Sequence, residues 1–351
     1  MIATGLKTAI GDGWRSIRSK ARGSAIVLTY HRIADLEFDP QLLAVSVDRF
    51  AEHAEVLSRA HHLMTAGELF ETMASGTALP ARTVVITLDD GYADTLLNAA
   101  RILAAHDIPA TAFVSSDYVG ATREFWWDEL ERVVLLGPAM PPSIGIAVGE
   151  ATYAAQHRAA VDDDEAAPDD PMSWDITKPV VTERQRVYLE LSGFLRRLTA
   201  TERETALAQL REQFGAEPLV RETHRPLKAA ELRELHDGGI VEVGAHTRSH
   251  QLLSELTTAA QDEEIRGGKS DLERLCGSEI RSFSYPFGGA SDFTDNTKQV
   301  VREAGFRGAC TTEFGMVVPW MDRFAVPRCP TEDVSGIELA RLVDAWFRMA
   351  R

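Results

Sequence analysis

Apolar residues along the chain follow two spacings that alternate from residue 25 onward. Seven short runs rich in apolar and β-branched residues predict buried strands: 25–30, 83–86, 110–114, 240–244, 280–285, 308–311 and 323–328. Between them, apolar residues three or four positions apart predict a helix at 96–105. Residues 258–261 (TAAQ) predict the start of another helix that runs to about residue 276. Roughly seven strand–helix units predict an α/β fold, and about this number builds a parallel barrel.

This alternation breaks between residue 138 and about residue 225. Residues 182–185 (TERQ) and 201–204 (TERE) have the sequence of a helix capping box and predict two helix starts. Residues 162–165 (DDDE) are typical of a solvated loop. We therefore expect one barrel domain over residues 25–351, with a helical insertion at about 138–225.

The predicted strand at 83–86 leads into two adjacent aspartates, Asp89 and Asp90, followed by Gly91. Asp is a good helix N-cap, but one carboxylate would be enough for that role. Two carboxylates at the tip of a buried strand are costly unless a cation compensates them. Because adjacent side chains leave a strand tip in opposite directions, one Asp could bind a metal while the other handles protons.

The predicted strand at 240–244 leads into His246 and His250, which are four residues apart. On one helical turn both imidazoles would point the same way and reach one ion. An isolated HxxxH pair is a weak signal. After a strand, in a chain that also has an aspartate pair at a strand tip, it strongly indicates a metal site.

Charge and cysteine content narrow the classes of partner and location. The formal net charge of −16 argues against a nucleic-acid partner, because phosphate binding needs clustered cations. The three cysteines have no spacing typical of a metal site or a disulfide framework. The simpler expectation is a reducing compartment, the cytoplasm.

Residues 1–24 are expected to form an amphipathic N-terminal helix, of which 1–22 is locally basic. No continuous apolar stretch follows the charges, so the segment resembles neither a secretory signal nor a transmembrane span. Two interpretations stay open. The helix lies on the anionic inner face of a membrane as a peripheral contact, or it docks on the body of the protein.

Two further features allow more than one interpretation. Trp126 and Trp127 are adjacent, and paired tryptophans are more often core than ligand contacts. A sugar's C–H face packs well on indole, so an aromatic platform is the other interpretation. Arg281 lies inside a predicted strand, where a lone cation needs a carboxylate partner.

Three motifs, 88–91 (LDDG), 246–250 (HTRSH) and 281–288 (RSFSYPFG), resemble the first three motifs of the polysaccharide deacetylase family in the same order. This family is also called the NodB homology domain or carbohydrate esterase family 4. The resemblance covers the chain from about residue 25 to residue 328. It implies a distorted, TIM-like (β/α)7 barrel and metal-dependent removal of an acetyl group, most often from an N-acetylated sugar.

The resemblance also implies roles for individual residues. Asp90, His246 and His250 match the metal-binding triad, and Asp89 matches the catalytic base. Arg281 matches the arginine that holds this base.

The remaining roles are the oxyanion donor, the substrate contacts and the acid. The backbone N–H of Phe287 matches the oxyanion donor, and Tyr285, Trp126 and Trp127 are the expected substrate contacts. The family commonly takes its acid from a late histidine, but the chain has no histidine after residue 250. In members with circularly permuted motifs an element at the first strand supplies the acid, and residues 28–31 (LTYH) match it with His31.

A late motif that carries an aspartate is also expected from the family, and Asp322 is the candidate for it. The predicted cofactor is a divalent metal, Zn²⁺ first, with Co²⁺, Ni²⁺ or Mn²⁺ as alternatives. The predicted reaction hydrolyses the N-acetyl group of a sugar in a polysaccharide, an oligosaccharide or a lipid-linked glycan. Three alternatives stay open: an amidohydrolase of a small non-carbohydrate amide, a catalytically weak carbohydrate-binding relative, and an interaction protein with structural histidines.

Overall fold

The computed structural model describes residues 23–137, 139–156 and 171–349 of the chain and divides into two compact units. Unit 1 contains residues 23–36, 43–120 and 227–349, and unit 2 contains residues 37–42 and 121–226. The second unit thus starts earlier than the predicted insertion at about 138. The basic segment 1–22 and the acidic run 162–165 lie outside the described residues.

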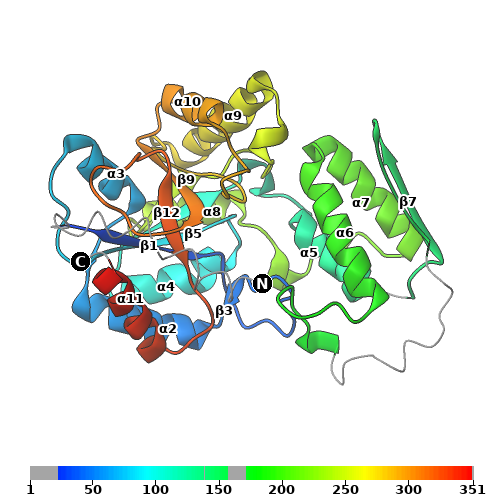
Figure 1. The fold of residues 1–351 in the computed structure, drawn as a ribbon, viewed down its shortest axis with the longest axis horizontal. Helices are drawn as coiled ribbons and strands as arrows, with labels where there is room; N and C mark the ends of the chain where they lie inside the picture. The colour runs from blue at the N-terminus through cyan, green and yellow to red at the C-terminus, as the bar shows by residue number, and fades with distance from the viewer. Residues whose placement is uncertain (1–22, 138, 157–170, 350–351) are drawn as a thin grey trace. The chain divides into compact units, whose positions relative to one another are not determined.

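A closed ring of seven parallel strands forms the centre of unit 1 (Figure 1). In ring order the strands are β1 Ala25–Tyr30, β12 Val326–Pro330, β11 Gly308–Phe314, β10 Ser282–Ser284, β9 Val241–Ala245, β6 Ala110–Val114 and β5 Thr83–Leu88. The pairing of β1 with β5 over six residues closes the ring. Each strand overlaps or directly adjoins a predicted run, so the predicted (β/α)7 barrel is confirmed.

Helices surround this ring (Figure 1). They are α2 Val47–Ala60, α3 Ala66–Ser75, α4 Arg101–Ala105, α8 Ala229–Asp237, α9 Thr258–Cys276, α10 Asp295–Glu303 and α11 Gly336–Met349. Shorter helical segments are η1 Thr95–Ala100, η2 Ser116–Tyr118 and η7 Leu253–Glu255. The two-residue strand β4 His62–Leu63 pairs with the start of β5, and β2 Arg32–Ile33 pairs with β3 Ala44–Val45.

Strand residues alternate between the two sides of the barrel wall. On β1, Ile26 and Leu28 pack in the large core cluster that includes residues of the surrounding helices, whereas Ala25 and Val27 belong to a separate buried cluster with Phe113. The same alternation on β5 places every second residue of that strand inside the ring. The side chain that continues this inner row beyond the end of β5 is that of residue 89.

Unit 2 is mainly helical, with one antiparallel hairpin that the sequence analysis did not predict. Its elements are α5 Trp126–Leu130, η3 Glu131–Leu135, β7 Ser143–Val148, β8 Ala151–Gln156, η5 Pro171–Ser173, α6 Glu183–Arg197, α7 Ala200–Phe214 and η6 Glu222–His224. β7 buries every second residue, as a half-exposed strand does. The capping box of α6 is at Thr182 as predicted, but that of α7 is formed by Thr199 and Glu202 rather than at Thr201.

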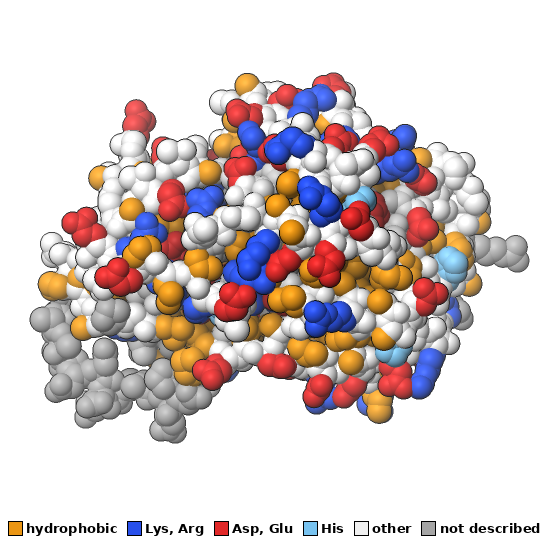
Figure 2. Space-filling model, turned by 180° about the vertical axis from the view of Figure 1, so that it is seen from behind, with side chains coloured by type: hydrophobic (Ala, Val, Ile, Leu, Met, Phe, Trp, Pro, Cys, Tyr) orange, Lys and Arg blue, Asp and Glu red, His pale blue; other side chains and the backbone are white. Residues whose placement is uncertain are grey.

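Acidic and basic side chains lie beside one another on the face in Figure 2, so no broad field of one sign covers that face. Among the described helices, none combines the length and the apolar character that crossing a bilayer requires. The three cysteines are free thiols, two of them buried.

Candidate active site

Asp89 and Asp90 extend β5 at its C-terminal end and are both buried, with 2% and 3% of their surface exposed. The backbone N–H of Asp89 donates to the carbonyl of Tyr30 at 2.9 Å and so continues the ladder to β1. The N–H of Gly91 then donates to the carbonyl of Asp89 at 3.0 Å, which closes a γ-turn around Asp90 with φ 75°. A Cβ on Gly91 would lie 2.8 Å from Val114, so this turn requires glycine.

Arg328 holds Asp89 from inside the barrel. This fully buried residue of β12 donates from Nη1 to Oδ1 of Asp89 at 2.8 Å and from Nη2 to Oδ2 at 2.7 Å. Nη1 also donates to the Thr87 hydroxyl at 3.1 Å, and Nε donates to the Thr311 carbonyl at 2.8 Å. The fork of two parallel bonds fixes both the position and the orientation of the carboxylate.

This pair determines the charge of Asp89. Burial alone would raise the pKa of the carboxyl, but the Arg328 guanidinium outweighs burial and lowers the pKa to about 2. Asp89 is therefore ionised at neutral pH. It is also a weaker proton acceptor than an unperturbed aspartate, because its low pKa means a low proton affinity.

Asp90, His246 and His250 place their ligand atoms around one point. Nε2 of His246 lies 3.6 Å from Oδ1 of Asp90, and Nε2 of His250 lies 3.4 Å from the same oxygen. Ligand atoms at about 2.1 Å from a tetrahedral Zn²⁺ ion lie about 3.4 Å apart. These two spacings, with all three ligand atoms within 4.8 Å of one another, fit a divalent ion.

The surroundings of His246 also fit a metal ligand. Its Nδ1–H donates to the carbonyl of Ser284 at 2.8 Å, which fixes the ring and leaves Nε2 directed at Asp90. Burial lowers the pKa of His246, although the Asp89 carboxylate opposes this effect. The ring is therefore neutral near pH 7, which is the form that binds metals.

A loop with two left-handed residues, not the predicted helical turn, presents the histidines. Thr247 has φ 63° and His250 has φ 54°, and the hydroxyl of Thr247 accepts the backbone N–H of His250 at 3.1 Å. Glu264 on α9 accepts the backbone N–H groups of Arg248 at 3.1 Å and Ser249 at 2.9 Å. These bonds hold a backbone that most residues would not adopt spontaneously.

Helix α9 approaches this loop closely at Gly268. A Cβ at this position would lie 2.7 Å from the backbone carbon of Thr247, so a larger residue would displace either the helix or the loop. Gly267 similarly lies against the side chain of Arg248. A pair of glycines in the middle of a helix is unfavourable by itself, and this contact accounts for it.

Phe287 occupies a second strained turn beside the triad. The N–H of Gly288 donates to the carbonyl of Pro286 at 2.7 Å around Phe287, whose φ is 61°. A bulky residue with positive φ is an outlier, and such outliers concentrate at functional sites. Its ring lies edge-on to that of His250, with centroids 4.7 Å apart. The structure thus brings the predicted oxyanion turn next to a predicted metal ligand.

His31 follows β1 directly and is half-buried. Because β1 and β5 pair in register from Ala25 opposite Thr83 onward, His31 lies opposite Asp89. A positive charge on His31 would lower the pKa of Asp89, so the two side chains are close enough to interact electrostatically. The structure therefore places His31 near Asp89, and its role as the acid stays a prediction.

Arg281 does not hold Asp89, and this prediction was wrong. Arg281 precedes β10 at the N-terminal end of the strand, whereas Asp89 lies at the C-terminal end of β5. Its half-exposed guanidinium pairs instead with Glu279 at 3.0 Å and Glu71 at 3.2 Å. Arg328 holds the Asp89 carboxylate instead, which was the role expected of Arg281.

The predicted substrate contacts are core residues. The Tyr285 ring is fully buried and stacks on Phe293 at 4.2 Å, and its hydroxyl donates to the Phe324 carbonyl at 3.0 Å. Trp126 and Trp127 are buried within unit 2 and pack edge-on against each other, with centroids 5.4 Å apart. Their indole faces therefore do not form an open platform, and the core interpretation holds for both.

Asp322, the candidate for a late aspartate motif, also lies away from the site. It is exposed and pairs with Arg302 at 2.9 Å.

Sequence reasoning missed Arg328 and Glu264. Arg328 could have been found by the argument applied to Arg281, because it is also a lone cation in an apolar strand. The Gly267–Gly268 pair could have indicated the close packing on α9.

A scan of protein families matches residues 76–139 and 210–309 to the family described as polysaccharide deacetylase. These segments contain Asp89, Asp90, His246, His250 and Phe287. The intervening residues 140–209 lie in unit 2. A search of curated proteins found no significant match.

Solved structures with a similar fold include two deacetylases and the protein IcaB. The Streptococcus pyogenes deacetylase PplD, in complex with acetate, is 14% identical over 91% of this chain and 97% of its own, with a TM-score of 0.55. IcaB from Ammonifex degensii is 17% identical over 92% and 97%, with a TM-score of 0.55. A polysaccharide deacetylase from Bacillus cereus is 17% identical over 91% and 69%, with a TM-score of 0.53.

At these identities the structural likeness shows the fold, and the family match adds the motifs. The matched segments carry the aspartate pair and both histidines, and the structure assembles all four at the C-terminal end of the barrel. The chain therefore belongs to the polysaccharide deacetylase family of hydrolases.

Proposed function

We propose that the protein is a divalent-metal-dependent deacetylase that hydrolyses the N-acetyl group of an N-acetylated sugar in a polysaccharide, an oligosaccharide or a lipid-linked glycan. The observation that carries this proposal is the buried triad of Asp90, His246 and His250 beside the Asp89–Arg328 pair. The acetate in the PplD structure supports it, because acetate is the product that such a reaction would release.

The triad would hold the ion, and its mixed nitrogen and oxygen ligands suit Zn²⁺ best, with Co²⁺, Ni²⁺ or Mn²⁺ as alternatives. When bound, such an ion polarises the acetyl carbonyl and lowers the pKa of water. Asp89 then takes the proton of the attacking water. Arg328 contributes by keeping the Asp89 carboxylate ionised and by fixing its orientation.

Two further groups complete the reaction on this proposal. The backbone N–H of Phe287 donates to the oxyanion that forms when water adds to the carbonyl, and a donor of this kind contributes roughly 3 kcal/mol. His31 protonates the nitrogen of the leaving amine, since an unperturbed imidazole has a pKa of about 6.5. The proton accepted by Asp89 and the proton given by His31 balance over one turnover.

Acetate release from a panel of substrates tests this function. The panel contains free, polymeric and lipid-linked N-acetylhexosamines together with a small non-carbohydrate acetamide. We expect release from at least one sugar substrate, its loss on chelation, and its recovery with Zn²⁺. Replacement of His246 or His250 by Ala should remove both the bound metal and turnover, whereas replacement of the exposed His62 should not. Turnover of the small acetamide alone would favour the amidohydrolase alternative.

We also propose that the protein acts in the cytoplasm and meets a lipid-linked substrate at the inner face of a membrane. The basic composition of residues 1–22 supports this, because anionic lipids attract clustered Lys and Arg. Flotation with anionic liposomes should fall when residues 1–22 are removed. Equal flotation of the full-length and shortened chains would rule this segment out as an anchor.

A further inference from the structure

A second group of candidate metal ligands lies within unit 2, outside the site described above. Asp128, Glu131 and His224 each offer one ligand atom, and these atoms all lie within 4.8 Å of one another. All three residues are buried, with 4%, 5% and 5% of their surface exposed. They come from α5, η3 and η6, so the chain brings ligands together from segments about ninety positions apart.

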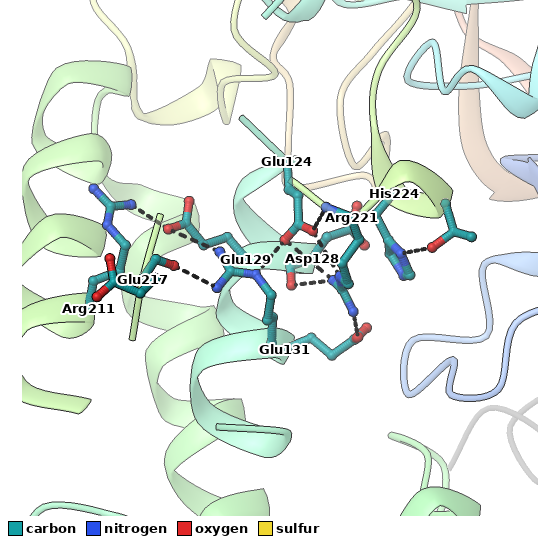
Figure 3. Close-up of polar contacts among 10 residues, drawn as sticks. Glu124, Asp128, Glu129, Glu131, Arg211, Glu217, Arg221 and His224 are labelled. Carbon is teal, nitrogen blue, oxygen red and sulfur yellow. Dashed lines mark hydrogen bonds and ion pairs between the residues drawn. The ribbon is translucent and has the colours of Figure 1, made fainter. Parts of the chain in front are cut away.

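The positions of the ligands are fixed by neighbouring polar groups (Figure 3). Nδ1 of His224 is 2.9 Å from the hydroxyl of Thr223, so Nε2 is the ring nitrogen that would bind an ion. Arg221 donates from Nη1 to Oε1 of Glu131 at 2.8 Å and from Nη2 to the carbonyl of Asp128 at 2.9 Å. Metal sites commonly have such partners, which orient both the histidine and the carboxylate ligands.

Arg221 is shared between two carboxylates, those of Glu131 and Glu124. Its backbone N–H and its Nε both donate to Oε1 of Glu124 at 2.8 Å. Glu124 is almost completely buried and also accepts a bond from Arg132 at 3.0 Å. A carboxylate has two oxygens, so Glu131 can accept Arg221 on Oε1 and bind an ion through Oε2.

The electrostatic environment favours one more positive charge at this place. Burial raises the pKa of Glu131, Arg221 opposes this, and the carboxylates of Asp39 and Glu124 raise it further. The pKa of Glu131 thus remains above its ordinary value although a guanidinium is in direct contact with it. Such a carboxylate would gain from a nearby cation.

We propose that Asp128, Glu131 and His224 form a second site for a divalent transition-metal ion, with Zn²⁺ as the best-suited ion. One imidazole and two carboxylates are borderline ligands that bind Zn²⁺ better than Mg²⁺ or Ca²⁺, which prefer oxygen ligands alone. Three protein ligands from α5, η3 and η6 would join the first and last helical segments of the inserted chain. The role is structural, and it is independent of the proposed deacetylation.

The test uses the full chain with the first site removed, as the variant Asp90→Asn/His250→Ala. After equilibration with Zn²⁺ and dialysis, we expect this variant to retain close to one Zn²⁺ per chain and to melt at a higher temperature with Zn²⁺ than after chelation. Mg²⁺ should give no such shift. Adding His224→Gln should reduce the bound Zn²⁺ at least tenfold. The matched control, Glu222→Gln, changes an exposed carboxylate of the same segment and should leave the bound Zn²⁺ unchanged.

Either of two results would overturn the proposal. The first is a folded Asp90→Asn/His250→Ala chain, verified by circular dichroism, that binds no Zn²⁺ and shows no shift in melting temperature. The second is full Zn²⁺ retention after His224→Gln. If His224→Gln does not fold, Asp128→Asn replaces it, and retained Zn²⁺ has the same meaning.

Discussion

At the scale of single residues, the site depends on two aspartates with different surroundings. Asp89 points into the barrel and binds Arg328 with both oxygens, whereas Asp90 sits in a γ-turn and faces two imidazoles. Their neighbours, not their residue type, separate the proposed role of Asp89 as proton acceptor from the proposed role of Asp90 as metal ligand. Arg328 is therefore a positioning residue for the proposed reaction.

We predict that Arg328→Lys lowers kcat by about 10²-fold and leaves the metal content unchanged. A lysine keeps the charge but cannot form two parallel bonds to Asp89, so the carboxylate loses its orientation. The pKa of Asp89 should also rise from about 2, because burial is then less well compensated. Carboxyl NMR and kinetics measured on the same samples check both effects. Arg281→Lys is the matched control, since Arg281 pairs only with surface carboxylates among the described residues. Similar losses in both variants would contradict the assignment.

His31→Ala should lower kcat by roughly 10² to 10⁴-fold with the metal retained, because no other group is assigned to protonate the leaving amine. The alkaline limb of the pH–rate profile should disappear, since that limb reports deprotonation of the acid. His62→Ala, at an exposed position, should change neither. A near-normal rate with an unchanged alkaline limb would transfer the acid role to another group.

The structure brings Asp89, Asp90, His246 and His250 together, because all four follow the ends of the barrel strands β5 and β9, and their roles stay predictions. Residue-level prediction failed for Arg281, since a buried arginine and a surface arginine look alike in sequence. Only the strand bounds show that Arg281 lies at one end of the barrel and Asp89 at the other. The sequence also offered Trp126 as a substrate contact, and burial decides against it.

At the scale of elements, the loop that carries His246 and His250 depends on α9. Glu264 binds the loop backbone, and Gly268 allows the helix to approach Thr247. The seven barrel strands were predictable because strands buried on both faces are nearly continuous apolar runs. The β7 strand was missed, because it buries only every second residue and so lacks the continuous apolar run of the barrel strands.

Gly268→Ala should weaken metal binding at the first site by about 10 to 100-fold. The added methyl would lie 2.7 Å from the backbone of Thr247 and would displace the loop that carries both histidines. Gly193→Ala is the matched control, because Gly193 lies within α6 with no atom within 4 Å of the added Cβ. That variant should gain roughly 0.5 to 1 kcal/mol of stability and keep its metal affinity. Metal titration together with denaturation separates the two outcomes, and unchanged affinity in Gly268→Ala would contradict the close contact.

At the scale of the whole molecule, Asp89 links the site to acid stability. Its pKa is about 2 in the folded chain and 3.8 ordinarily, so it binds fewer protons when folded. The stability it contributes is fully present above about pH 4 and is lost as the pH falls toward 2. Asp94 and Glu131 have raised pKa values, so the stability that they contribute changes with pH in the opposite direction. The pH dependence of the total stability therefore does not isolate the contribution of Asp89.

We therefore predict a pH-dependent difference between wild type and Asp89→Asn. The difference in their unfolding free energies should shrink by about 2 kcal/mol between pH 5 and pH 2, in favour of the variant. Urea denaturation at several pH values, with low salt held constant, measures it. A difference that does not vary with pH would mean that Arg328 does not lower the pKa of Asp89.

The partners in this pair are 239 positions apart in sequence. At a synthesis rate of about 5 to 20 residues per second, a ribosome would make Arg328 roughly 10 to 50 s after Asp89. During that interval the nascent chain already contains Asp90, and later both histidines, but β12 with Arg328 has not yet been synthesised. A growing chain could therefore acquire its proposed metal ligands before it can orient Asp89, the proposed base. A chain that stops before residue 328 would lack the guanidinium that orients Asp89, so the proposed hydrolysis could begin only after β12 has been made.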